Sequence, residues 1–133
     1  MWLSGRWKKA TGVEYSSSEW VKAACVPGVH YKVARVSLAR RAEITRRVRC
    51  LLSKLEYQQA GAALEDRLAA AEVACQVDRI YVEWGLLEVE GLQIDGRACN
   101  VELLVEAGPE PLCREIARRI RQECSLNAEE RKN

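Results

Sequence analysis

The chain has 133 residues, a hydrophobic fraction of 48% and a formal net charge of +2, which fit one compact domain around a single core. Phe is absent, so the core is expected to be aliphatic, and helices packed through Leu and Ala suit it. No stretch approaches the roughly 20 apolar residues of a membrane-spanning helix, and no apolar signal-peptide core follows Met1. A cytoplasmic protein that does not engage a membrane is therefore expected.

The N-terminal segment shows no sustained helical or strand period. Residues 1–28 combine three Trp residues with isolated Gly residues and a run of three Ser residues, and they end at Pro27 and Gly28. This composition predicts an irregular N-terminal arm over residues 1–28, followed by a single helical domain over residues 29–133.

A short strand and a long helix are predicted next. Apolar and polar residues alternate over residues 29–36, which favours a half-buried strand. Ser37 can cap a helix that runs from about Leu38 to about Gln59. Its apolar stripe, spaced near the 3.6-residue period, consists of Leu38, Ile44, Val48, Leu51, Leu52 and Leu55.

A second long helix is predicted after Gly61 and extends to about Gly85, with Leu64 and Leu68 in its apolar pattern. Residues 29–60 contain 8 basic and 2 acidic residues, whereas residues 61–112 contain 3 basic and 11 acidic residues. Two helices joined by a short connection normally lie antiparallel, so a basic helix should lie beside an acidic one. Mutual attraction between the two helices is the simplest explanation for this separation of charge.

The last third of the chain predicts one extended segment and two further helices. Residues 87–96 alternate up to an Asp95-Gly96 turn signal, and this segment is expected to pair with the strand near Tyr31. Asn100 can cap a brief helix over residues 101–107 that ends at Gly108. A final helix is expected from Pro109 to about Cys124, with an inward face of Leu112, Ile116 and Ile120.

The predicted fold is therefore mainly α. It is a small helical domain of about four helices, with a minor short β element near residues 29–36 and 87–96.

The residue types used in catalysis and metal binding form no recognisable pattern. The six Cys residues are each separated by ten or more residues, so no C-x-x-C pair exists to begin a metal site. Cys25 and His30 could be imagined as a nucleophile and base, but no orienting third group stands at a recognisable spacing. Glycine-rich phosphate-binding motifs are also missing from the sequence. The sequence predicts a protein that is not an enzyme and needs no cofactor or metal.

A cluster of arginines is the feature of the sequence best suited to binding a partner. Six of them lie between Arg35 and Arg49, and the last predicted helix carries the pair Arg118-Arg119. Guanidinium groups pair well with phosphates, so a nucleic-acid-binding face over residues 35–49 is an alternative interpretation. No recognition-helix motif accompanies the charge, so the sequence disfavours nucleic acid as the partner.

Three stretches of the chain together resemble the small tail assembly chaperones of long-tailed phages and prophages. They are the extended run and Arg-rich helix within residues 28–51, the segment Val-Glu-Gly-Leu-Gln-Ile-Asp-Gly at residues 89–96, and the charged tail of residues 111–133. The likeness covers roughly residues 28–133 and is a pattern of parts, not a catalytic signature.

This resemblance implies a non-enzymatic chaperone that coats the tape measure protein and helps to recruit tail tube subunits during virion morphogenesis. Self-association is left open. A helix-rich client would bind through apolar grooves together with charges of both signs. The residues expected to contact the partner are Arg40, Arg41, Arg46, Arg47, Arg118 and Arg119.

Overall fold

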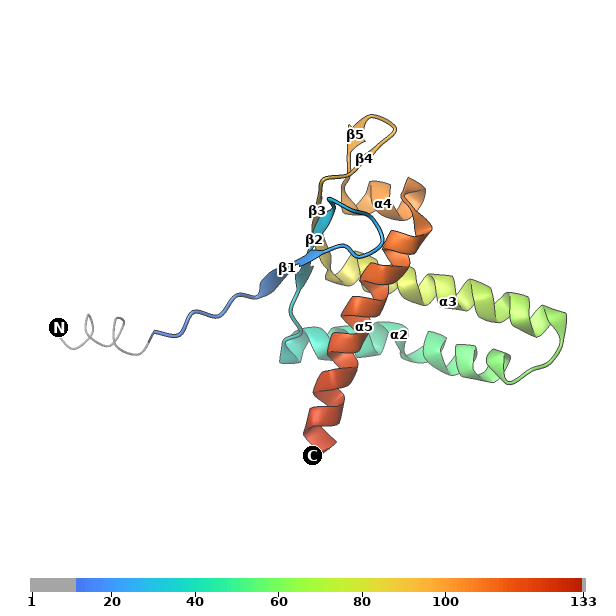
Figure 1. Ribbon diagram of the computed structural model, residues 1–133. Helices are drawn as coiled ribbons and strands as arrows, with labels where there is room; N and C mark the ends of the chain where they lie inside the picture. The colour runs from blue at the N-terminus through green and yellow to red at the C-terminus, as the bar shows by residue number, and fades with distance from the viewer. Residues whose placement is uncertain (1–11, 133) are drawn as a thin grey trace.

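The computed structural model describes the backbone of residues 12–132 and the side chains of residues 12–124. The chain forms two small antiparallel sheets and four helices in this part (Figure 1). In chain order the elements are β1 (Ser18–Lys22), β2 (His30–Ala34), α2 (Leu38–Gln59), α3 (Leu64–Gly85), β3 (Leu86–Glu90), β4 (Gln93–Ile94), β5 (Arg97–Ala98), α4 (Val101–Ala107) and α5 (Glu110–Lys132). The prediction of a mainly helical fold with minor strands is confirmed.

The segment predicted to be an irregular arm contains a strand. Ser18–Lys22 forms β1 and pairs antiparallel with β2, with Val21 opposite Tyr31, so the irregular interpretation is wrong for these residues. Five residues are too few for a convincing alternation, and the inward position taken by Glu19 breaks the apolar pattern. Residues 1–11 of the expected arm lie outside the described residues.

The predicted pairing of the two extended segments is confirmed. β2 pairs antiparallel with β3, with Tyr31 opposite Val89, so the sheet order is β1-β2-β3. β4 and β5 form a second hairpin whose Asp95 and Gly96 both adopt positive φ, as an Asp-Gly hairpin turn requires.

The helix boundaries follow the expected capping residues. The Ser37 side chain accepts a hydrogen bond from the Arg40 backbone N–H, and the Asn100 side chain accepts one from the Leu103 N–H. α2 therefore begins and ends at the predicted residues. α3 begins at Leu64, three residues after Gly61. α5 continues to Lys132, beyond the expected end near Cys124.

The core lies where the helices cover one face of the three-stranded sheet. Val21, Tyr31 and Val33 point from the sheet into this core. From α5, Leu112, Ile116 and Ile120 are all buried, as predicted. α5 packs across α3 and leaves the outer end of the α2–α3 hairpin projecting beyond it (Figure 1). No helix among the described residues is long and apolar enough to span a bilayer.

Candidate protein-binding surface

The outer end of the α2–α3 hairpin exposes large apolar side chains. Tyr57, near the end of α2, is 81% exposed, while Leu64 and Leu68, in the first turns of α3, are 67% and 63% exposed. Leu64 and Leu68 are four residues apart and so share one face of α3. The sequence placed both in the apolar pattern of this helix, and they are exposed because α5 does not extend over this end of the hairpin (Figure 1).

Leu38 is another exposed leucine, at the opposite end of the hairpin. It is the first residue of α2 and is 78% exposed, so this member of the predicted apolar stripe is not covered. The stripe does pack where α2 meets α3: Ile44 and Val48 are buried, and Leu51, Leu52 and Leu55 contact the core. Periodicity therefore identified the face of α2 but not how far the core extends along it.

Arg40, one of the six arginines expected to bind a partner, is half-buried and bonded to another part of the protein. Its Nη2 donates a hydrogen bond of 2.5 Å to the carbonyl oxygen of Trp84, in the last turn of α3. Its guanidinium carbon lies 4.2 Å from the centroid of the Trp84 ring, and the indole N–H donates to Glu43. Arg40 thus joins the start of α2 to the end of α3.

We expect Arg40→Ala to lower the free energy of unfolding by about 1.5 kcal/mol, because it removes the stacking on Trp84 and one hydrogen bond. The Nε of Arg40 is buried and has no hydrogen-bond partner among the described residues, which keeps the loss from being larger. Urea denaturation followed by tryptophan fluorescence measures it. The control is Arg47→Ala on the exposed face of α2, for which a change within about 0.5 kcal/mol is expected; equal losses would contradict the role given to Arg40.

The other five arginines are distributed over separate places. Arg41 donates to the carbonyl oxygen of Cys124 at 2.8 Å, which ties α2 to α5. Arg119 pairs with Glu19 of β1 at 3.0 Å. Arg46, Arg47 and Arg118 are exposed and make no ion pair with any side chain of residues 12–124. Three of the six expected arginines, Arg40, Arg41 and Arg119, are therefore engaged in contacts within the protein.

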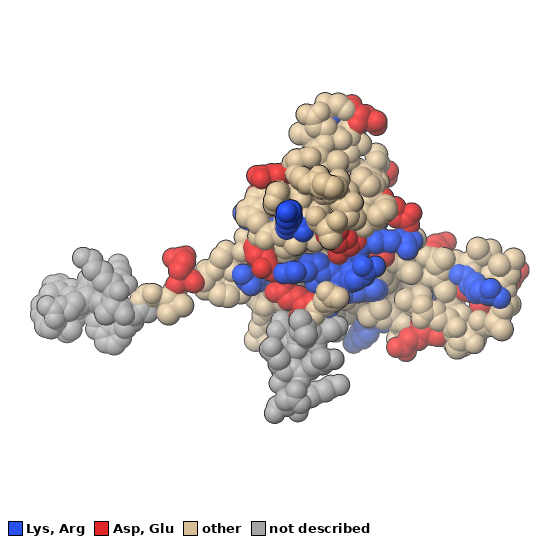
Figure 2. Space-filling model, viewed as in Figure 1, with Lys and Arg blue, Asp and Glu red and all other residues tan. Residues whose placement is uncertain are grey.

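Charge on α5 is interleaved. Blue side chains form a band across the middle of the face shown in Figure 2, and red side chains border it. Arg114 pairs with Glu110 at 2.6 Å within α5, and Arg121 lies 3.8 Å from Asp78 of α3. Among the described side chains, the ion pairs of α3 reach α4 and α5, and none reaches α2. The expected ion pairing of α2 with α3 is therefore wrong among the described side chains. The two helices meet through apolar residues and through the contacts of Arg40 and Glu43 with Trp84.

Glu115 makes the most hydrogen bonds of any described side chain, and no sequence pattern pointed to it. Its carboxylate accepts from the backbone N–H groups of Ala24 and Cys25, at 2.9 to 3.1 Å, and from the Tyr31 hydroxyl at 3.0 Å. Burial raises the pKa of Glu115, but these hydrogen bonds outweigh it and hold the pKa below its usual value. Glu115 fastens the loop between β1 and β2 to α5.

No hydrogen bond joins Cys25 and His30, the pair considered as a nucleophile and base. The Cys25 residue is exposed as a whole. Partial desolvation of its thiol, together with the neighbouring Glu115 carboxylate, raises the pKa of the thiol and so disfavours the thiolate. His30 is exposed on β2. Among the described side chains, those of residues 12–124, no group of three or more is suited to hold a metal ion.

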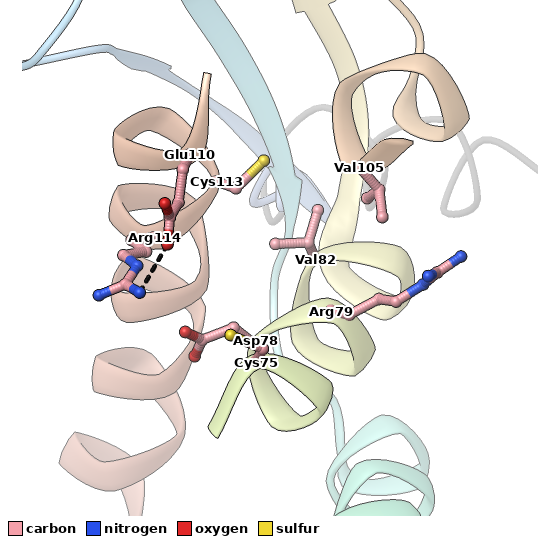
Figure 3. Close-up of a pocket in the computed structure, with 8 residues that line it drawn as sticks. All are labelled: Cys75, Asp78, Arg79, Val82, Val105, Glu110, Cys113 and Arg114. Carbon is pink, nitrogen blue, oxygen red and sulfur yellow. Dashed lines mark ion pairs between the residues drawn. The ribbon is translucent and has the colours of Figure 1, made fainter. Parts of the chain in front are cut away.

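A cavity of about 240 Å³ lies between α3, α4 and α5. Val82, Val105 and Cys113 come from these three helices and border the gap in Figure 3. The thiol of Cys113 donates to the Leu104 carbonyl oxygen at 3.5 Å, and burial raises its pKa. The charged residues at the rim, Asp78, Arg79, Glu110 and Arg114, are all in ion pairs, so this cavity offers a small apolar floor and no unpaired charge.

Comparisons of the chain with protein families, with curated proteins and with solved structures find no match.

Proposed function

We propose that this protein is a non-enzymatic tail assembly chaperone or adaptor that binds the tape measure protein in the host cytoplasm and assists tail tube assembly. The observation that carries the proposal is the outer end of the α2–α3 hairpin, where Tyr57 of α2 and Leu64 and Leu68 of α3 are each exposed. Large exposed apolar side chains at one end of a hairpin favour a protein partner. The identity of the client comes from the resemblance within residues 28–133.

The arrangement suits a long helical client. An amphipathic client helix can place an apolar ridge against Leu64 and Leu68, which lie along one face of α3. Charged residues adjoin this apolar patch, since Glu65 and Asp66 occupy the first turn of α3. Apolar contact bordered by charge gives binding that is specific and can still be reversible.

The test is capture of a co-expressed tape measure protein by the purified chain, at low salt and at about 0.5 M salt, where exposed charges are largely screened. We expect capture to persist at high salt. The double variant Leu64→Gln, Leu68→Gln should weaken capture at least tenfold, because each leucine loses its apolar contact. Leu38→Gln is the matched control, since Leu38 is also an exposed leucine in the first turn of a helix, and it should change capture less than twofold.

One observation favours a second candidate, a nucleic-acid-binding protein. Arg46, Arg47 and Arg49 lie exposed on α2 and form no ion pair among residues 12–124. Phosphate binding through them would weaken steeply as salt rises, and Arg46→Ala with Arg47→Ala would abolish it. Retention of double-stranded DNA at low salt, with no capture of the tape measure protein, would overturn the chaperone proposal in favour of this one.

A further inference from the structure

β1 is an outer strand of the three-stranded sheet, and only alternate residues of β1 form backbone hydrogen bonds to β2. The Ala23 N–H donates to the Val29 carbonyl oxygen at 2.9 Å, and the Arg35 N–H donates to the Ser17 carbonyl oxygen at 2.8 Å. Antiparallel strands alternate between residues that bond inward and residues that bond outward. Odd-numbered residues of β1 therefore bond to β2, and the backbone groups of Ser18, Trp20 and Lys22 point away from the sheet.

The open part of this edge is only two residues long. The Ser16 hydroxyl donates to the Ser18 carbonyl oxygen at 2.7 Å and accepts from the Ser18 N–H at 3.4 Å, so Ser18 is satisfied locally. Trp20 and Lys22 remain, each with one N–H and one carbonyl oxygen that have no partner among the described residues. An edge strand with free groups is a template for pairing with another strand.

The side chains along this edge are arranged for one kind of partner. Val21 faces the core, while Trp20 and Lys22 lie on the opposite face of the sheet, where Trp20 is 44% exposed. The Nζ of Lys32, across the strand pair, lies 5.8 Å from the Trp20 ring centroid, and Lys32 also pairs with Glu88 at 3.6 Å. A lysine opposite Trp20 on the open side would extend this row of charged and aromatic contacts.

We propose that two copies of this chain pair edge to edge through β1, with Trp20 of one protomer opposite Lys22 of its partner and Val21 opposite Val21 at the two-fold axis. In this register all four open groups of each protomer are used, which gives four backbone hydrogen bonds across the interface. Each indole lies between Lys32 of its own chain and Lys22 of the partner. The three-stranded sheets of the two protomers then form one antiparallel sheet of six strands.

The competing register, with Trp20 opposite Trp20, is disfavoured. It places Lys22 opposite Ser18, whose backbone groups are already bonded to Ser16, so only two hydrogen bonds can form across the interface. Pairing through β1 also leaves the outer end of the α2–α3 hairpin untouched. The inference is therefore independent of the proposed client.

The first test is sedimentation equilibrium of the full chain under reducing conditions, from about 10 µM to about 1 mM, a range suited to a weak interface. Lys22→Pro removes the outward N–H without disturbing the bonds to β2, and it should raise the dimer dissociation constant at least tenfold. Lys22→Ala keeps the N–H and should raise it only about threefold. Circular dichroism checks that both variants remain folded.

A second test fixes the register and does not depend on the proline variant. Val21→Cys should form a disulfide between residues 21 of the two protomers under mild oxidation, since directly opposite Cα atoms lie within disulfide range. Trp20→Cys should form no link between residues 20. Peptide mass spectrometry distinguishes either link from those of the six native cysteines.

Three outcomes would overturn the proposal. They are a wild-type chain that stays monomeric throughout the concentration range, a dimer unaffected by Lys22→Pro but lost in Leu64→Gln, and a Trp20→Cys link without a Val21→Cys link. The second outcome would move the interface to the hairpin end, and the third would select the competing register.

Discussion

Gly91→Ala is expected to lower the free energy of unfolding by about 3 kcal/mol, the largest effect of any single substitution proposed for this protein. Gly91 follows directly after β3 and has φ of +85°, a conformation that residues with a side chain rarely adopt. A Cβ at this position would also overlap the carbonyl oxygen of Gly28, which belongs to the backbone and cannot rotate away. The ends of β2 and β3 could then no longer close on one another.

Gly96→Ala is the matched control because it separates the two causes. Gly96 also has positive φ, at +77°, but no atom lies within 4 Å of the position that its Cβ would take. Its substitution should therefore cost only the conformational strain, about 1 kcal/mol. Urea denaturation of both variants measures the two losses of unfolding free energy. Losses of equal size would show that a Cβ at position 91 does not overlap the Gly28 carbonyl oxygen.

Glu115→Gln is expected to lower the free energy of unfolding by about 2 kcal/mol at pH 7, with an allowance for solvent around the partly exposed carboxylate. The amide keeps the shape of the side chain but places an N–H₂ group among the donors from Ala24, Cys25 and Tyr31. At least one of these donors then loses its acceptor. The loop between β1 and β2 should separate from α5 more readily.

The same substitution has a pH dependence of defined sign. The hydrogen bonds hold the pKa of Glu115 below its unfolded value, so their stabilisation is complete above the unfolded pKa and is lost as pH falls through the folded pKa. The gap between wild type and Glu115→Gln should therefore be widest at neutral pH and should narrow below about pH 4. Urea denaturation at pH 7 and at pH 3 measures it.

Glu110→Gln provides the control on the same helix. Its carboxylate pairs with Arg114 one turn away and is 67% exposed, so its loss should cost at most about 0.5 kcal/mol. A gap between wild type and Glu115→Gln that stays constant with pH would show that the carboxylate charge of Glu115 does not stabilise the loop.

The sequence by itself determined the local elements that carry their own signals. Ser37 and Asn100 begin helices because their side chains accept the backbone N–H groups that a helix leaves unpaired. Asp95 and Gly96 form a turn because both tolerate positive φ. The inward face of α5 followed from the spacing of Leu112, Ile116 and Ile120.

Only the tertiary structure decided which apolar residues are covered and which charges are paired. Leu38, Leu64 and Leu68 obey the same helical period as buried Ile44, but they are exposed because the covering elements end before they reach them. Arg40 and Arg47 belong to one basic cluster in the sequence, yet Arg40 lies against Trp84 while Arg47 is exposed. The side chains that Glu115 and Trp84 contact lie far from them in the sequence, and no local pattern encodes which distant segment will be adjacent. Periodicity specifies the face of a helix, whereas contacts between distant segments decide what that face meets.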